Sequence, residues 1–97
     1  MKRLLVLRRV VGESMLPTLR PEQLVVGIGI GAPKDGQVVI LAHGGLEKVK
    51  RIASINGETA YVLGDNAPAS TDSRQFGRVP REQIIARVIW PRTRLPS

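Results

Sequence analysis

The chain has 97 residues, enough for one domain with a buried core and too few for two. Hydrophobic residues make up 42% of it and aromatic residues only 3%, which predicts a folded domain with an aliphatic core. The net charge of +7 is compatible with binding to nucleic acid or to an anionic membrane surface. However, the basic residues are scattered along the chain, and Phe76 is the one aromatic residue near them in a loop. We therefore expect a solvated surface and no nucleic-acid partner.

Several classes of site are excluded by composition. Cysteine is absent, so disulfides and thiol catalysis are impossible. His43 is the only histidine, which excludes a multi-histidine metal site, and we expect neither a metal nor another cofactor. The apolar stretch Leu4–Leu7 is too short for a signal peptide or a membrane span. The sequence thus predicts a soluble, cytoplasmic protein with one domain over residues 1–97.

Strand signals dominate the chain, because short β-branched runs alternate with glycine, proline and asparagine. Gly27 and Gly29 indicate a bulge or a close backbone contact within their strand. Hairpins are expected at residues 43–45 and at Asn56-Gly57, the pair preferred in a type I′ turn. The expected strands cover residues 4–11, 23–30, 37–42, 46–55, 59–63 and 83–90. They predict an all-β, barrel-like domain of strongly bent antiparallel strands.

A polar loop without hydrophobic periodicity covers residues 64–77, and one helical turn is expected at residues 79–82. Long loops in compact domains are usually functional or disordered. Asp72 and Arg74 are spaced so that they can pair within a turn and fix the loop. Ser70 supplies a hydroxyl that can hydrogen-bond an amine. The alternative is an ordinary polar surface loop bounded by two glycines.

A candidate nucleophile, Ser14, follows the first expected strand. Gly12 allows the backbone to bend, while Pro17 fixes its own φ and restricts the residue before it. The Ser14 hydroxyl would therefore sit on a stiff corner. A serine attacks a carbonyl only when a base removes its proton and amide donors stabilise the oxyanion. Without such partners, the segment would be an ordinary turn.

A candidate base is Lys50, which precedes Arg51 on an expected strand. Side chains alternate along a strand, so one of these two cations should point inward. Burial disfavours a charged amine and lowers its pKa, which would let a lysine accept a proton. The alternative is a pair of exposed charges.

Three segments in this order resemble the conserved boxes of the S26 serine peptidases, a family that includes the type I signal peptidases. They are Ser-Met-Leu-Pro-Thr-Leu at 14–19, Val-Lys-Arg-Ile at 49–52, and Gly-Asp-Asn…Ser…Asp-Ser-Arg-Gln-Phe-Gly within 64–77. The short spacing between the last two, the loop sequence and the lack of a membrane anchor are most similar to the maturation proteases of nickel-type superoxide dismutase. The resemblance implies the all-β fold shared by signal peptidases and the SOS-repressor peptidases.

The resemblance also implies roles for individual residues. Ser14 would be the nucleophile and its backbone N–H an oxyanion donor. Lys50 would be the general base, with Ser70 orienting its amine. Asp72 and Arg74 would form a supporting ion pair.

Two other positions near Ser14 have uncertain roles. Met15 could line a substrate subsite or pack in the core. Gly12 occupies the position where some signal peptidases carry a second serine that assists the oxyanion, so a second donor is missing there.

The implied substrate is a precursor protein that loses a short N-terminal leader, foremost the nickel superoxide dismutase precursor. No cofactor is needed, and the oligomeric state is left open. Within the peptidases, the alternative is an enzyme for other leaders, recruited to a membrane by a partner if it is a signal peptidase relative. Outside them, the chain could be a small basic β-barrel that binds RNA or DNA, or a serine hydrolase that uses His43.

Overall fold

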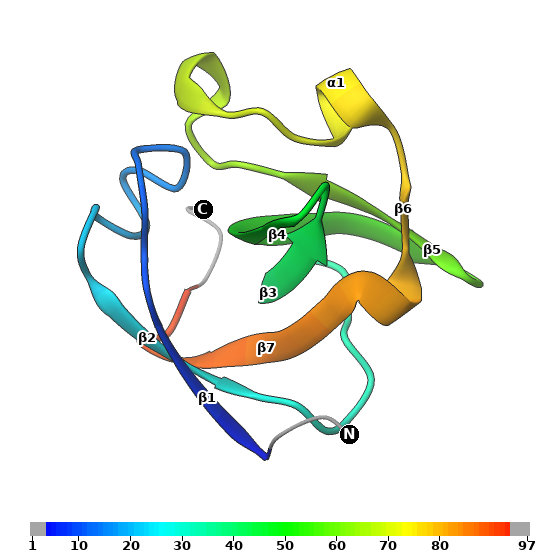
Figure 1. Cartoon of the computed structure of the whole chain (residues 1–97), viewed down its shortest axis with the longest axis horizontal. Coiled ribbons are helices and arrows are strands. Elements are labelled where there is room, and N and C mark those ends of the chain that lie inside the picture. The colour runs from blue at the N-terminus through cyan, green and yellow to red at the C-terminus, as the bar shows by residue number, and fades with distance from the viewer. Residues whose placement is uncertain (1–3, 94–97) are drawn as a thin grey trace.

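A computed structural model describes residues 4–93 and confirms the all-β prediction (Figure 1). Its strands are β1 (Leu5–Arg9), β2 (Leu24–Ile28), β3 (Val38–His43), β4 (Leu46–Asn56), β5 (Thr59–Leu63), β6 (Val79–Pro80) and β7 (Ile84–Trp90). Three short helical segments complete the fold: η1 (Ala67–Ala69), α1 (Ser73–Phe76) and η2 (Arg81–Gln83). All described strand pairs are antiparallel.

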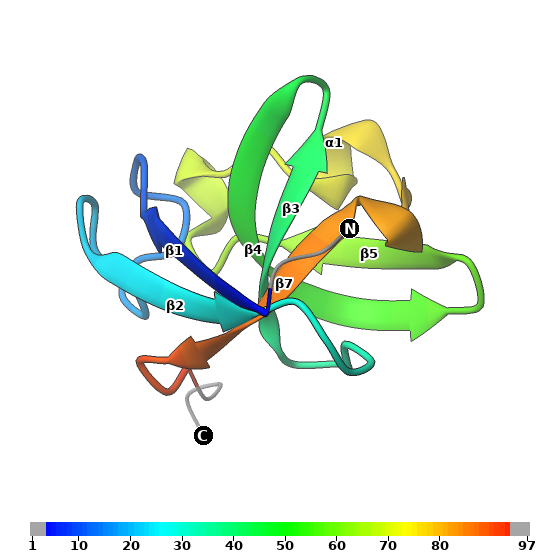
Figure 2. The same cartoon turned by 60° about the horizontal axis from the view of Figure 1, so that its bottom comes forward.

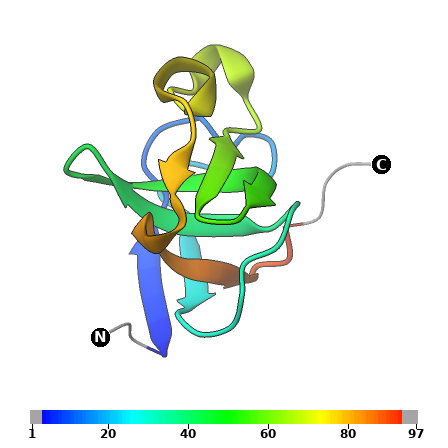
Figure 3. The same ribbon diagram turned by 90° about the vertical axis from the view of Figure 1, so that its right-hand side faces the viewer.

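The strands form one strongly bent, seven-stranded sheet in the order β1-β2-β7-β3-β4-β5-β6. Among residues 4–93, β1 pairs only with β2, and β6 pairs only with β5. The expected barrel-like sheet is therefore not a closed barrel, although it is strongly curved (Figure 3). One physical reason lies in β6, which has two residues, of which Pro80 has no N–H to donate to a further strand.

The strand that carries Gly27 has both features expected from its glycines. The register between β2 and β7 shifts between Val26 and Gly27, as at a bulge. A Cβ atom at Gly27 would lie 2.9 Å from the Cβ of Ala86. Glycine therefore lets β7 approach β2 more closely than another residue would allow.

Both expected hairpins are present, but one turn is displaced by a residue. Gly44 and Gly45 connect β3 to β4 with φ values of 61° and 79°, as a type I′ turn requires. In the second hairpin Asn56 pairs with Thr59, so the turn residues are Gly57 and Glu58 instead of Asn56 and Gly57. Of these two, only Gly57 has a positive φ, which is the type II′ pattern.

The loop at residues 64–77 is more regular than expected, since it contains η1 and α1. Asp72 caps α1, and the side chain of Gln75 accepts a hydrogen bond from the Asp72 N–H, which completes a capping box. Single helical turns are too short to produce hydrophobic periodicity, so the sequence pattern did not reveal them. The turn expected at residues 79–82 is also shifted, since β6 comes first and η2 follows it.

The core consists of two clusters separated by β3. Val38 and Ile40 pack in the first cluster, with β1, β2 and the Ser14 segment, whereas Val39 and Leu41 pack in the second, with β4, β5 and β6. All four are fully buried, because side chains alternate across a strand that is covered on both faces. Figure 2 shows the β3–β4 hairpin standing between the β1–β2 pair and β5.

None of the helical segments among residues 4–93 has the length or apolar character needed to cross a bilayer.

Candidate active site

Ser14 lies in the turn between β1 and β2, and buried residues fix this turn to the core. The neighbouring Met15 and Leu19 are fully buried in the first cluster. Leu16 N–H donates to Glu13 O at 3.2 Å, and Leu19 N–H donates to Met15 O at 2.9 Å. Ser14 itself is half-buried. The corner expected from the sequence is therefore held by core packing and by its own backbone hydrogen bonds.

Met15 was expected either to line a substrate subsite or to pack in the core. Its side chain has no exposed surface and lies in the first core cluster. The structure therefore places Met15 as an anchor for the serine corner.

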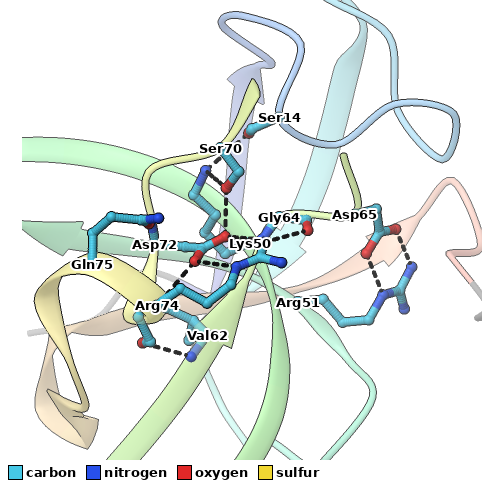
Figure 4. Close-up of polar contacts among 11 residues, drawn as sticks. Ser14, Lys50, Arg51, Val62, Gly64, Asp65, Ser70, Asp72, Arg74 and Gln75 are labelled. Atoms are coloured by element: carbon cyan, nitrogen blue, oxygen red, sulfur yellow. Dashed lines mark hydrogen bonds and ion pairs between the residues drawn. The ribbon is translucent and has the colours of Figure 1, made fainter. Parts of the chain in front are cut away.

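Lys50 on β4 joins the serine corner to the loop at residues 64–77. Its side chain is 5% exposed, and its Nζ atom lies 2.9 Å from Ser14 Oγ. Lys50 Nζ also donates to Ser70 Oγ at 3.2 Å, and Ser70 Oγ donates to Asp72 Oδ2 at 2.6 Å. Figure 4 shows the lysine amine between the two serine hydroxyls. The sequence segments 14–19, 49–52 and 64–77 thus meet through a continuous chain of polar contacts.

The environment of Lys50 makes its neutral form easier to reach than in a solvated lysine. Burial lowers the pKa of the Lys50 amine below its ordinary value of 10.5 and outweighs the opposing effect of the Asp72 charge. The positive charges of Lys48 and Arg74 lower this pKa further. A neutral amine has a lone pair, and the contact of 2.9 Å allows it to accept the proton of Ser14.

Asp72 is fully buried, and its carboxylate accepts hydrogen bonds from several sides. Arg74 donates to it from Nη2 at 2.6 Å and from Nε at 3.0 Å, which is the ion pair expected within this loop. Gly64 N–H donates to the same carboxylate at 2.8 Å. Burial alone would raise the pKa of Asp72, but the hydrogen bonds from Arg74, Ser70 and Gly64 outweigh it and hold this pKa well below its usual range.

Gly64 lets the loop pass tightly between the two serines. A Cβ atom at this position would lie 2.2 Å from Ser70 Oγ and 2.7 Å from Ser14 O. No other residue fits without moving one of these groups. The sequence marked Gly64 as a boundary of the loop, and the structure shows that it is also a point of close approach.

One of Lys50 and Arg51 was expected to point inward, and the structure buries both. Arg51 lies on the opposite face of β4 from Lys50. It is nevertheless only 4% exposed, because both faces of this strand are covered. Its guanidinium donates to Asp65 from Nε at 2.9 Å and from Nη2 at 2.8 Å, and to Gly36 O at 2.7 Å.

Asp65 connects this second buried cation to the serine corner, a role that sequence reasoning missed. Its Oδ2 atom accepts a hydrogen bond from the Thr18 hydroxyl. Burial would raise the pKa of Asp65, but the hydrogen bonds from Arg51 and Thr18 outweigh it and lower this pKa. The only sequence signal was its place in the Gly-Asp-Asn segment that contributes to the family resemblance, and no role was assigned to it there.

Asn66 is a further contact that sequence reasoning missed. Its backbone N–H donates to Ser14 O at 2.8 Å, and its side-chain Nδ2 donates to Glu13 O at 3.0 Å. Asn66 therefore hydrogen-bonds the carbonyl groups of both Glu13 and Ser14, which flank the Ser14 N–H along the backbone.

An open groove of about 420 Å³ leads to Ser14 and Lys50. Its walls come from the end of β1, from residues 11–14, from residues 47–50 of β4, and from Ala69 and Thr71 of the loop at residues 64–77, with Ile40 also part of its lining. Arg8 of β1 and Glu47 of β4 form an ion pair across these walls, with Arg8 Nε 2.5 Å from Glu47 Oε1.

His43 lies at the end of β3, where its Nδ1 is 3.0 Å from Gln83 Oε1 and its ring centroid is 4.3 Å from that of Phe76. Across residues 4–93, no hydrogen bond joins His43 to Ser14. This arrangement disfavours a serine hydrolase that depends on His43.

A protein-family model described as signal peptidase, peptidase S26, matches residues 55–92. The matched region contains the loop with Ser70, Asp72 and Arg74, but it does not reach back to Ser14 or Lys50. A comparison with curated proteins found no match. The family match supports a serine peptidase with signal-peptidase-like processing, and a peptidase of this family implies a protein substrate.

Proposed function

We propose that the protein is a Ser/Lys endopeptidase that removes a short N-terminal leader from a precursor protein. One observation carries the proposal: a buried lysine amine lies 2.9 Å from the hydroxyl of Ser14. In this proposal Ser14 is the nucleophile and Lys50 is the general base. Ser70 orients the Lys50 amine, and Asp72 with Arg74 holds Ser70.

In the acylation step, the neutral Lys50 amine accepts the Ser14 proton while Ser14 Oγ attacks the scissile carbonyl carbon. The carbonyl oxygen becomes an oxyanion, and the Ser14 backbone N–H donates to it. When the oxyanion collapses, the peptide C–N bond breaks, and protonated Lys50 delivers its proton to the leaving amine. The leader remains attached to Ser14 as an ester.

In the deacylation step, the same lysine acts on water. Neutral Lys50 accepts a proton from a water molecule, whose oxygen attacks the ester carbonyl. Collapse of this second oxyanion breaks the bond to Ser14 Oγ, and Lys50 returns the proton to the serine. The enzyme is restored, and the leader leaves with a free carboxylate.

Two backbone edges beside the groove support binding of an extended peptide. Among the described residues, β1 pairs only with β2, and residues 46–50 of β4 pair only with β3, since pairing with β5 begins at Arg51. Both segments contribute to the groove. Unpaired strand edges bind extended chains through main-chain hydrogen bonds, which suits a flexible leader better than a folded domain.

We further propose that the substrate is the nickel superoxide dismutase precursor, from the resemblance of the loop at residues 64–77. Processing of other leaders is the alternative within the same chemistry. Reaction in the cytoplasm is part of the same proposal and can be checked by fractionating cells.

The direct test is to incubate the protein with a nickel superoxide dismutase precursor and to identify the new N-terminus by mass spectrometry. We expect one cleavage at the end of the leader. Ser14→Ala and Lys50→Ala should each reduce the rate on the order of 10³-fold or more, because each removes a group that acts in every bond-breaking step.

The variants and a second set of leaders separate the possible failures. Wild-type rates in both variants would contradict the proposed mechanism. Cleavage of other precursors but not of this one would contradict the substrate and retain the mechanism.

A further inference from the structure

We propose that Asn66 is a positioning residue that aims the Ser14 backbone N–H at the oxyanion. The inference deepens the proposed function and rests on it, since an oxyanion forms only if Ser14 attacks a carbonyl. Two hydrogen bonds join Asn66 to the serine corner, and the planarity of the peptide bond links them to the direction of the Ser14 N–H.

The side chain of Asn66 fixes the peptide plane between Glu13 and Ser14. Its Nδ2 donates to Glu13 O at 3.0 Å. In a planar trans peptide, the C=O and the following N–H point in opposite directions. Since Glu13 C=O points at Asn66, the Ser14 N–H must point away from it. Glu13 and Ser14 line the groove and Asn66 does not, so the donor faces the groove side.

The backbone of Asn66 fixes the next peptide plane, between Ser14 and Met15, whose C=O is likewise directed at Asn66. Its N–H donates to Ser14 O at 2.8 Å. Within residues 4–93, the Ser14 N–H donates to no other group, so it is available to a substrate oxygen. A preorganised donor stabilises the oxyanion most, because no group must reorient during the reaction.

Support from Asn66 adds to the core packing and backbone hydrogen bonds that hold the corner, where Gly12 gives the backbone extra freedom. Gly12 has a φ of 76°, and nothing lies within 4 Å of a Cβ placed there. Because glycine has no side chain, position 12 neither braces the corner nor supplies a second hydroxyl donor.

Asn66 itself is well anchored. The preceding Asp65 is held by Arg51 through hydrogen bonds of 2.9 and 2.8 Å. Asn66 O also accepts a hydrogen bond from Ala69 N–H at 3.0 Å, in the turn that forms η1. The orientation of the oxyanion donor is thus transmitted from the buried strand β4 through Asp65 and Asn66 to the serine corner.

The test uses Asn66→Asp, which keeps the shape of the side chain and the backbone N–H but removes the side-chain donor. Repulsion between the new carboxylate and Glu13 O should turn the peptide plane. We expect kcat to fall about 10- to 100-fold with KM changed less than about threefold, since loss of one oxyanion donor costs about 10²- to 10³-fold. Asn66→Ala should show the same pattern, and Asn56→Ala in the β4–β5 hairpin is the matched control.

A merely structural role is separated by inhibitor binding. A peptide aldehyde forms a tetrahedral adduct with the serine, whereas the product peptide does not. If Asn66 positions the donor, Asn66→Asp weakens the aldehyde by the same factor as kcat and leaves product binding unchanged. Equal loss of both affinities would overturn the proposal, as would wild-type kcat in this variant.

A measurement that needs no turnover distinguishes failure of the positioning role of Asn66 from failure of the proposed peptidase function. The amide resonance of Ser14 in ¹⁵N NMR should shift in Asn66→Asp and stay in place in Asn56→Ala. An inactive wild-type protein would refute the peptidase function. An unshifted Ser14 amide would refute the role of Asn66 in orienting this group, whatever the activity.

Discussion

At the scale of one residue, the proposed general base Lys50 costs stability. The residue is 5% exposed, and burial lowers the pKa of its amine. Between the lowered pKa in the folded state and the ordinary value of 10.5, the unfolded chain binds more protons than the folded one. Stability therefore rises with pH across this window, and the folded state bears the full cost at pH values below the lowered pKa.

Lys50→Met should therefore stabilise the protein. Ser70 Oγ still donates to Asp72 in this variant, so no buried hydroxyl loses its acceptor. We expect a gain of about 1 kcal/mol at neutral pH, because an apolar side chain of similar volume replaces a buried cation. The gain should shrink as the pH approaches 10.5, the ordinary lysine value. Denaturant unfolding at several pH values measures this, and a loss of stability at neutral pH would contradict it.

The same pKa predicts the pH dependence of cleavage. Only neutral Lys50 can accept the Ser14 proton, so kcat/KM should rise with pH and level off above the pKa of this amine. Because this pKa is lowered, the plateau should be reached below 10.5. An initial-rate profile checks the prediction, and a profile that falls over this range would argue against lysine as the base.

At the scale of elements, β4 and the loop at residues 64–77 work as a unit. Lys50 and Arg51 leave opposite faces of β4, and each connects to this loop, at Ser70 and at Asp65 respectively. Asp72 caps α1 and also holds Gly64 and Ser70. The loop is thereby fixed against the serine corner without a long helix or a hairpin of its own.

Asp72→Asn should loosen this unit. The new amide places N–H donors opposite the donors of Ser70 and Arg74. We expect the free energy of unfolding to fall by about 2–3 kcal/mol at neutral pH, a figure that allows for the weaker contribution of the partly exposed Arg74. The pKa of Asp72 is lower in the folded state than its ordinary value of 3.8, so its contribution is present above that pH and is lost as the pH falls further. The difference between wild type and variant should thus shrink in acid. A constant difference down to strongly acidic pH would contradict the assignment.

Many of the strands and local contacts could be predicted from the sequence. There is a physical reason why the other contacts could not. Strand β5 and the pairing of Asp72 with Arg74 were predicted from local pattern and spacing. Asp65 and Asn66 act through partners far along the chain, Thr18 and Ser14, which no local pattern reveals. The turn at Gly57 also moved by one residue, because strand pairing and not the dipeptide alone sets its register.

At the scale of the whole molecule, β3 divides the core, and only one of its faces lies under the groove. Ile40 packs in the first cluster and belongs to the groove lining, whereas Ile52 of β4 packs in the second. The β-branched run at residues 37–42 predicted a strand, but it could not show that its alternate residues pack in separate clusters. That division depends on the order of strands, which follows from long-range pairing.

Ile40→Val and Ile52→Val form a matched pair that tests the division. Both side chains are fully buried, so each change should cost about 1 kcal/mol of stability through loss of one methylene. Only Ile40→Val should raise KM, because it alters the floor of the groove. Thermal unfolding and steady-state kinetics check both parts, and equal changes of KM would contradict the location of the substrate.

In the proposed mechanism, Ser14 becomes acylated by the leader. The measurement is to mix the protein with a leader peptide, quench the reaction in acid and map the acyl group by mass spectrometry. We predict the mass of the acyl part of the leader on Ser14 in the wild type and no adduct in Ser14→Ala. Cleavage by Ser14→Ala at the wild-type rate, or an acyl group on any other residue, would contradict Ser14 as the nucleophile.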